Sequence, residues 1–303
     1  MAFGDINRVN TNLQAMSSQF SLNKVNSQLA DNQMKLSTGL RINKAEDDAA
    51  GFSIASKLSG RIAGLEQAER NVGDAKSMLD VAESGMNTIM DTLVEMKSKA
   101  TQGATDSIGS DERGYIKDQI ESLASEINGV ADQTTFQGTD LLGAQGDAAA
   151  TGSSSTFQVG EGSGDTKQVD IAATRSDDLF DSSSAAISGT DDGTNAGTTE
   201  GITLTDSSQG TFNTLIDNID SAISDVASTF NQIGIDQNSL SIKQENLSQS
   251  ITSNSAARSR IEDADFAKVQ SESVKLQIMQ QTATSALAQA NSSPQAVLGF
   301  LGG

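Results

Sequence analysis

The sequence of 303 residues contains no cysteine, no histidine and no tryptophan, and it has one proline and one tyrosine. The absence of cysteine excludes a disulfide framework and thiol chemistry. Without histidine and cysteine, the chain cannot build the common zinc sites or a Ser-His or Cys-His nucleophile pair. We therefore expect no catalytic residue, no metal ligand and no cofactor, and we predict that the protein is not an enzyme.

Aromatic residues and long apolar runs are also scarce. Only 36% of the residues are apolar and 4% are aromatic, so a large globular core is not expected. Small aliphatic side chains suit thin seams between helices instead. No apolar run approaches the length of a membrane span, and the opening MAFGDINRVN lacks the basic and apolar regions of a signal peptide. These features predict no membrane insertion.

Positive charge is lacking in the middle of the chain, and the formal net charge is −20. Residues 46–142 hold eight basic and eighteen acidic side chains, and residues 143–255 hold three and sixteen. Such acidity argues against binding to nucleic acid or to an anionic membrane. The ends are near neutral, with five basic and two acidic side chains in residues 1–45 and four of each in residues 256–303. These ends could lie inside an assembly without severe repulsion.

Two series of apolar residues, each with a seven-residue spacing, are the most prominent pattern in the sequence. We call them the rod seam, which consists of Leu65, Val72, Leu79, Met86 and Leu93, and of Phe212, Ile219, Val226, Ile233, Leu240 and Leu247. This spacing indicates long helices that pack against a partner as in a coiled coil. The expected helices run from near Asn43–Asp48 to about residue 100, and from Thr211 to about Ser255.

Shorter apolar patterns occupy both ends of the chain. We call them the inner seam, which consists of Ile6, Val9, Leu13, Met16 and Phe20, and of Val269, Leu276, Met279 and Leu287. At Leu22 the first pattern changes phase, which we interpret as a break in the heptad repeat. Gly39 is expected to end the first helix, and the closing helix is expected to stop before Pro294. Another helix is predicted after Ser110, a good N-cap residue.

The middle of the chain is rich in Gly, Ser, Thr and Asp. Alternating residues predict a β-hairpin at about 157–171, which turns at Gly160–Gly164. This turn, GEGSG, opens no helix, so it does not fit a nucleotide fingerprint. The pairs Asp177/Asp178 and Asp191/Asp192 match no EF-hand spacing and are interpreted as solvated surface. We expect residues 172–210 to form a short surface excursion or to be partly disordered.

These patterns predict a mainly α protein, in which long antiparallel helical rods or coiled coils are formed by the N- and C-terminal segments around a small β-hairpin region. We expect residues 1–45 and 256–303 to form an inner terminal coiled-coil domain. Residues 46–171 and 211–255 are expected to form a helical rod domain.

Several blocks of sequence resemble bacterial flagellins. The segment TGLRINKAEDDAAG at residues 38–51, followed by FSIA, is similar to the N-terminal signature of that family. The segment SRIEDADFA at residues 259–267 is similar to the second signature, and residues 280–298 resemble the closing helix and tail. The resemblance covers about residues 1–171 and 211–303. The short middle segment lies outside it.

This resemblance implies a structural subunit that self-assembles into the helical filament of the bacterial flagellum, for swimming motility. The implied partners are other copies of the chain, hook-filament junction and cap proteins, and the export apparatus with its chaperone. Flagellins are exported through the channel of the flagellum, so the implied location is extracellular. The resemblance also favours a structural joint at Arg41, Asn43, Asp47 and Asp48, although the spacing alone fits an ordinary helix start.

One departure from the family concerns a host receptor. The surface that the flagellin-sensing Toll-like receptor contacts usually has an arginine four residues before a leucine, and a glutamate on the next helix. The corresponding positions here are Thr92, Met96 and Gln119. We therefore expect weak recognition by this receptor.

Three other interpretations remain open from the sequence. A hook-filament junction protein would share the terminal helices. A secreted coiled-coil adhesin or translocator would need an apolar or aromatic surface in the exposed middle, which has almost none. An intracellular scaffold would explain the heptads but not the two terminal signatures.

Overall fold

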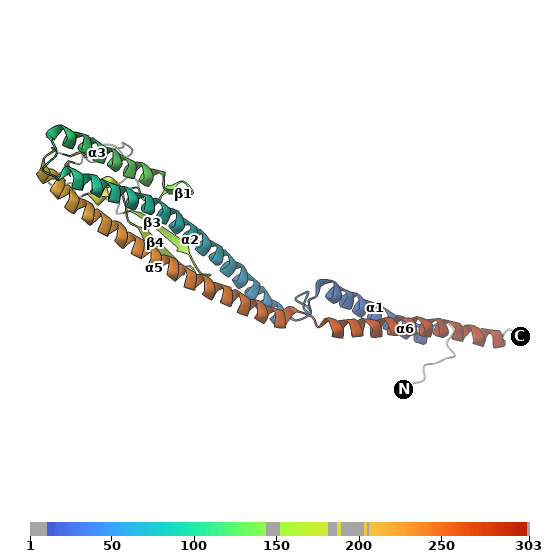
Figure 1. Ribbon diagram of the computed structural model, residues 1–303. Coiled ribbons are helices and arrows are strands. Elements are labelled where there is room, and N and C mark those ends of the chain that lie inside the picture. The colour runs from blue at the N-terminus through green and yellow to red at the C-terminus, as the bar shows by residue number, and fades with distance from the viewer. Residues whose placement is uncertain (1–10, 144–151, 181–186, 189–202, 205, 302–303) are drawn as a thin grey trace. The chain divides into compact units, whose positions relative to one another are not determined.

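The structure is a computed structural model that describes residues 11–143, 152–180, 187–188, 203–204 and 206–301 (Figure 1). The chain divides into two compact units, which are described separately below. The first comprises residues 1–62 and 252–303, and the second comprises residues 63–251. The predicted class, a mainly α protein with a small β region, is confirmed.

Two antiparallel helices from opposite ends of the chain make up most of the first unit. They are α1 (Leu13–Thr38) and α6 (Phe266–Leu301), which lie side by side in Figure 1. The predicted stop at Gly39 is confirmed, because Gly39 has φ 72° and its N–H donates to Lys35 O at 3.0 Å. Asp265 caps the start of α6, where its Oδ1 accepts the N–H of Lys268 at 3.1 Å.

The prediction that the closing helix stops before Pro294 is wrong, since α6 continues to Leu301. A proline inside a helix removes the hydrogen bond to the carbonyl four residues earlier, which here belongs to Ala290. That carbonyl instead accepts a hydrogen bond at 2.8 Å from Nδ2 of Asn12. A side chain from the neighbouring helix therefore replaces the missing donor.

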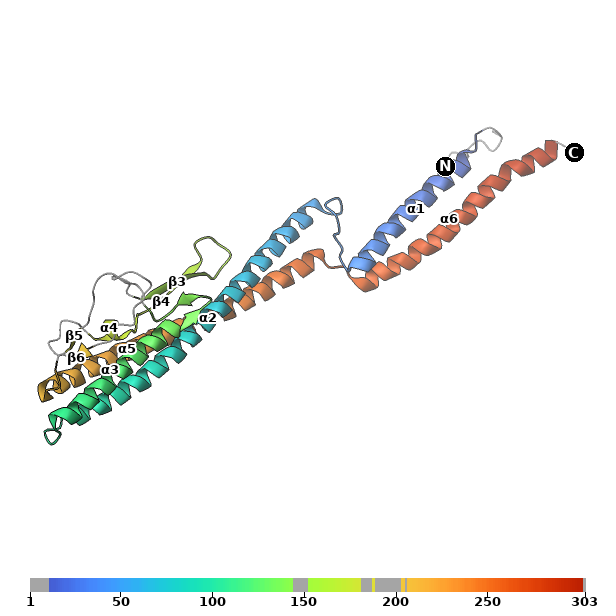
Figure 2. The same cartoon turned by 90° about the horizontal axis from the view of Figure 1, so that it is seen from above.

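The second unit is built on two long helices, α2 (Ala49–Gly103) and α5 (Gln209–Glu262), whose ends 49–62 and 252–262 belong to the first unit. Within the second unit, Figures 1 and 2 both show α2 and α5 side by side with α3 (Ser110–Gln133) alongside them. Contacts of Gln237 Nε2 with Asp80 Oδ1 and Glu83 Oε2, each 3.0 Å, tie α5 to α2. All eleven residues of the rod seam are buried, and together with α3 they form one core.

The first turn of α3 differs by one residue from the prediction. Gly109 rather than Ser110 is the N-cap, and it has an extended conformation without a capping side chain. The loop before it is held instead by Arg113, whose Nε donates to Gly103 O at 3.1 Å and whose Nη2 donates to Thr105 O at 3.0 Å. The arginine thus orders the loop before α3, while the first turn of the helix has no side-chain cap.

The predicted hairpin is present as β3 (Ser153–Gln158) and β4 (Thr166–Ile171), paired antiparallel from Ser153↔Ile171 to Gln158↔Thr166. Val169 and Ile171 point into the core, as the alternation predicted. Two contacts fasten the hairpin to the long helices. Asn71 of α2 donates to Gln158 O at 2.9 Å, and Lys167 Nζ lies 2.8 Å from Oδ1 of the buried Asp236 of α5.

A second, very short hairpin, which we did not predict, follows α3. It joins β1 (Thr135–Phe136) to β2 (Thr139–Asp140) through Gln137 and Gly138, which have φ 51° and 81°. Two successive positive φ angles are typical of a type I′ turn, in which a glycine is favoured. The Gln-Gly pair was therefore the available signal.

Residues 172–180 are not the surface excursion that we expected. They contain α4 (Ser176–Leu179), and Thr174, Ser176, Leu179 and Phe180 are all buried. The N–H of Ser176 donates to Oδ1 of the buried Asn128 in α3 at 2.8 Å. Farther along, β5 (Ile187–Ser188) pairs with β6 (Thr203–Leu204). Asp191 and Asp192 lie outside the described residues.

Candidate functional site: the assembly surface and the joint

The terminal helices α1 and α6 expose large apolar side chains. On α1, exposure is 55% for Leu13, 62% for Met16 and 72% for Phe20. In residues 266–292 of α6, for which exposure is described, the exposed large apolar residues are Phe266, Val274, Ile278 and Met279. We call these seven residues the outer face. Large exposed apolar groups repeated along a helix pair usually mark a surface that another protein covers.

The inner seam of the sequence analysis separates into two sets. Leu13, Met16, Phe20 and Met279 belong to the outer face, whereas Leu276 is buried and Val269 and Leu287 are half-buried. Ile6 and Val9 lie outside the described residues. The inner seam is thus not one continuous contact between α1 and α6.

The change of phase at Leu22 is a change of face, which corrects our interpretation of a heptad break. The covered residues of α1 include Ala15, Ser18, Leu22, Val25, Leu29, Asn32 and Leu36, an unbroken 3-4 repeat. Leu22 follows Phe20 by two positions, which places it about 200° around a helix with 3.6 residues per turn. One side of α1 therefore packs on α6 while the opposite side carries the outer face.

Amide side chains join α1 to α6, and the sequence analysis did not identify them. Besides the contact from Asn12, Nδ2 of Asn32 donates to Val269 O at 2.9 Å, and Nε2 of Gln280 donates to Oδ1 of Asn26 at 2.7 Å. Asn32 occupies a position of the covered repeat and is only 8% exposed. A polar residue at such a position, where an apolar one is expected, was the available signal.

The joint consists of the loop from α1 to α2 and the connection from α5 to α6. A short antiparallel bridge, Leu40↔Asp263, pairs the two connections. The N–H of Arg41 donates to Glu262 O at 2.6 Å, and the N–H of Ala264 donates to Gly39 O at 2.9 Å. The backbone itself thus holds both chain connections together.

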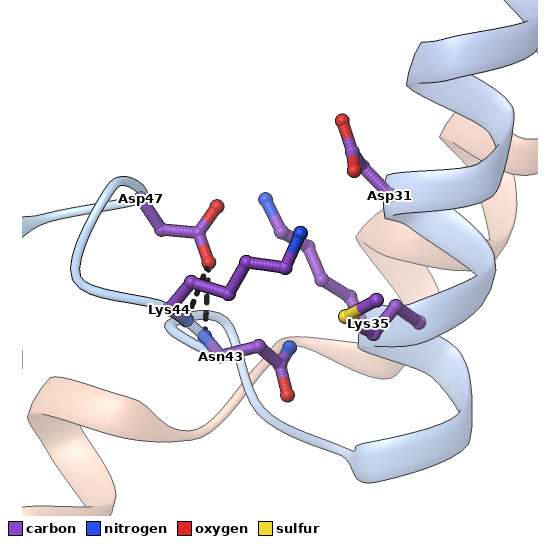
Figure 3. A pocket seen from close by; sticks show the side chains of 6 residues that line it. Asp31, Lys35, Asn43, Lys44 and Asp47 are labelled. Atoms are coloured by element: carbon purple, nitrogen blue, oxygen red, sulfur yellow. Dashed lines mark hydrogen bonds between the residues drawn. The ribbon is translucent and has the colours of Figure 1, made fainter.

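All four residues predicted for the joint form hydrogen bonds with backbone groups near them. Nη2 of Arg41 donates to Ile261 O at 2.7 Å, in the last turn of α5, where a cation is favourable. Oδ2 of Asp47 accepts the N–H groups of Asn43 and Lys44 at 3.0 Å each, as Figure 3 shows. Oδ1 of Asp48 accepts the N–H of Gly51 at 2.9 Å, which caps α2.

These backbone contacts have an electrostatic consequence for Asp47. The hydrogen bonds from the N–H groups of Asn43 and Lys44 lower the pKa of the Asp47 carboxyl below its usual value of 3.8. Both bonds favour the charged form of the side chain. The fourth predicted residue, Asn43, also donates through Nδ2 to Leu40 O at 3.0 Å. The loop is therefore fastened by its own polar side chains.

Ile42 and Gly51 are further joint residues that the sequence analysis missed. Ile42 is 2% exposed, in a loop of mostly polar residues. A Cβ atom on Gly51 would lie 2.7 Å from Cδ1 of Ile42 and 2.7 Å from Oδ2 of Asp48, so no larger residue fits without a shift. Ile42 thus covers the first turn of α2.

The joint offers no pocket suited to a ligand. A shallow hollow beside it is lined by Asp31, Met34, Lys35, Asn43, Lys44 and Asp47, in which the two acidic and two basic side chains balance (Figure 3). Within the described ranges, no three acidic side chains lie close enough to hold a metal ion. No described helix has the length and hydropathy required to cross a membrane.

Comparisons with known proteins place these features in one family. The model of the bacterial flagellin N-terminal helical region matches residues 9–147, and that of the C-terminal helical region matches residues 216–301. Flagellin of Bacillus subtilis is 35% identical over 97% of this chain and 99% of its own length. The chain belongs to the bacterial flagellin family. Flagellins are structural proteins, and this one is a subunit of the flagellar filament.

Other relatives agree with this assignment. A flagellin of Halalkalibacterium halodurans is 32% identical, and the flagellar filament 33 kDa core protein of Treponema phagedenis is 30% identical, each over 97% of this chain and 99% of the relative. A solved structure described as a flagellar hook-associated protein from Vibrio parahaemolyticus covers 72% of this chain and 100% of its own, with a TM-score of 0.55 and 14% identity. At that identity, the likeness shows a shared fold only.

The positions that correspond to the receptor surface of other flagellins do not share one environment here. Gln119 is exposed, Thr92 is 9% exposed and Met96 has no exposed area. The inclusion of Thr92 and Met96 in a receptor-facing surface is therefore wrong. The side chain of Thr92 is buried, and that of Met96 fills the core between the helices of the second unit.

Proposed function

We propose that this flagellin polymerises by covering the outer face of its terminal helices with the same region of neighbouring copies. The observation that carries the proposal is the exposure of Leu13, Met16 and Phe20 on the side of α1 opposite to α6. Burial of an apolar side chain of this size stabilises an interface by about 1.5–3 kcal/mol. Several such residues per copy supply a sufficient driving force.

The polymer is expected to be open rather than closed. The outer faces of α1 and α6 differ in sequence and shape, so a contact between the α1 surface of one copy and the α6 surface of another is heterologous. Heterologous contacts whose rotation does not close produce helical filaments. The near-neutral charge of residues 1–45 and 256–303 supports their placement inside the filament, away from the acidic remainder.

The remaining parts of the chain have supporting roles in this proposal. Residues 46–171 and 211–255 form the rod layer around the inner domain of residues 1–45 and 256–303, and the rod seam closes within each copy. The joint at Arg41, Asn43, Asp47 and Asp48 fixes the chain entries into α2 and α6. The chain is secreted through the flagellar export apparatus with a chaperone, and it meets hook-filament junction and cap proteins in the extracellular flagellum.

Electron microscopy and sedimentation of the purified full chain test the proposal. The wild type is expected to form filaments after addition of a precipitating salt or filament seeds. The double variant F20S/I278S should raise the critical concentration for polymerisation by about tenfold or more, because two apolar contacts of about 1.5–3 kcal/mol each are weakened.

Val94→Ser is the matched control, since Val94 of α2 is 55% exposed but lies in the second unit. It is expected to shift the critical concentration less than the double variant. A wild type that stays monomeric, or a V94S effect as large as that of F20S/I278S, would contradict the proposal.

A further inference from the structure

Pro294 leaves one backbone carbonyl of α6 without a donor in its own helix. A proline has no N–H, so the carbonyl four residues earlier, that of Ala290, cannot form its helical hydrogen bond. Ala290 is only 2% exposed. Because water has little access there, an unpaired carbonyl would reduce the stability of the helix pair.

Asn12 supplies the missing donor from the other helix. Its Nδ2 lies 2.8 Å from Ala290 O, while its Oδ1 accepts the N–H of Ala15 at 3.0 Å and so caps α1. Exchange of the amide oxygen and nitrogen would set a donor against a donor and an acceptor against an acceptor. The side chain therefore has one orientation, and both of its polar groups are used.

Only in the observed register does Asn12 satisfy a carbonyl that lacks a donor in its own helix. The chain has a single proline, so every other carbonyl of α6 from Phe266 to Ala290 is followed four positions later by a residue with an N–H. If α1 slid along α6 by one turn, Asn12 would face carbonyls that already have donors, and Ala290 O would lose its partner. A buried polar contact of this kind is a well-attested means of fixing helix register.

We propose that Asn12 and Pro294 act together to set the register of the terminal helix pair, with Asn12 as the positioning residue. The role rests on the proposed function, because the register decides how the outer faces of α1 and α6 are presented to neighbouring copies. Asn32, which donates to Val269 O at the opposite end of the pair, then holds the same register at a second point.

A double-mutant cycle on the full chain tests this coupling through the critical concentration of seeded polymerisation. Asn12→Ser keeps a capping oxygen for the N–H of Ala15 but cannot reach Ala290 O. Pro294→Ala restores an N–H that can donate to Ala290 O within α6. Asn23→Ser, at an exposed position of α1, is the control for the same chemical change.

N12S is expected to raise the critical concentration about fivefold in the wild-type background. This is the effect expected when one hydrogen bond is lost and a covered carbonyl is left unpaired. In the P294A background the same change should have an effect smaller than about twofold, because the carbonyl is then satisfied. N23S should leave the critical concentration unchanged. Equal effects of N12S in both backgrounds, or no effect in either, would overturn the proposal.

A second measurement covers the case in which P294A does not assemble alone. Each variant is mixed in equal amount with wild-type protein and wild-type seeds, and its share in the filaments is determined by mass spectrometry. N12S is expected to enter about one fifth as often as the wild type, and N12S/P294A as often as P294A. If Asn12→Ser lowers the share of the variant in the filaments equally in the wild-type and P294A backgrounds, the coupling is refuted. If wild-type seeds fail to grow, the assembly proposal itself is refuted.

Discussion

The two helical regions of this flagellin differ in the exposure of their apolar side chains. In the second unit, α2 presents Val72, Leu79, Met86 and Leu93 with no exposed area at all. In the terminal pair, only Val25, Leu276 and Ala290 are buried apolar residues of α1 and α6 among those described, while seven exposed apolar residues form the outer face. One region completes its core within the chain, and the other leaves apolar surface for a neighbour.

The polar contacts between the helices also differ between the two regions. Between the long helices α2 and α5, the ion pair of Lys97 with Asp220 lies at the rim of an apolar core. In the terminal pair, Asn12 and Asn32 donate to backbone carbonyls of the facing helix. Since little apolar area is buried between α1 and α6, directional hydrogen bonds have a larger share in holding this pair. Register is thus specified by polar atoms where the apolar seam is thin.

The sharpest test of this comparison applies one substitution to both regions. Leu93→Ala removes a side chain with no exposed area, and it should lower the free energy of unfolding of the monomer by about 2–5 kcal/mol. Leu13→Ala changes a side chain that is 55% exposed, so monomer stability should change by less than about 0.5 kcal/mol. Urea denaturation followed by circular dichroism measures both.

Polymerisation completes the test of Leu13→Ala. We expect a critical concentration several-fold above that of the wild type, because the apolar contact made on assembly is lost. If L13A destabilised the monomer as much as L93A, the outer face would be part of an internal core and the comparison would fail.

A smaller effect is expected at the joint, where the stabilising contacts are local. Asp48→Lys removes the acceptor for the N–H of Gly51 and places a cation at the positive end of α2. The combined cost is about 1–3 kcal/mol, from the lost cap and the helix dipole. Amide hydrogen exchange at Gly51 and Phe52 should accelerate, and filament formation should be impaired.

Asp48→Asn is the control for this prediction, because an amide oxygen still caps the helix. Its exchange rates and filament yield should stay close to those of the wild type. Normal filaments from D48K would remove the assigned role of Asp48 in the joint.

Much of the fold follows from local rules that a sequence exposes. The rod seam is visible because residues such as Leu79 and Leu240 repeat every seven positions, and helix ends are visible at Gly39 and Asp48, where one side chain or its absence decides the conformation. The β3–β4 hairpin is visible for the same reason, since Val169 and Ile171 alternate with polar residues. Each of these sequence patterns lies within a few residues of the helix, helix end or strand that it predicts.

The remaining features depend on contacts between distant parts of the chain. Pro294 looked like a helix end because the donor that replaces its N–H comes from Asn12, 278 positions away. Leu22 looked like a break in the repeat because only the packing of α6 shows which side of α1 is covered. Phe180 looked like part of a loop because its pocket is made by the core of the second unit. Local propensity gave no information on these pairings.

The smallest effect that the comparison predicts is a pH dependence of the joint. The backbone N–H groups of Asn43 and Lys44 lower the pKa of Asp47, so the charged form stabilises the loop. This contribution is complete above the usual carboxyl pKa and is lost as the pH falls through the lower folded value. The Asp47 carboxyl is exposed, and solvent screening keeps the contribution small. We expect the amide proton shifts of Asn43 and Lys44 in the monomer to titrate together, with a midpoint below 3.8.

The control for this prediction is Asp47→Asn, which keeps an acceptor but has no charge to lose. In this variant, both amides should lose the titration while the second unit is unaffected. A midpoint at or above 3.8 in the wild type would show that the two N–H contacts do not hold the loop in solution.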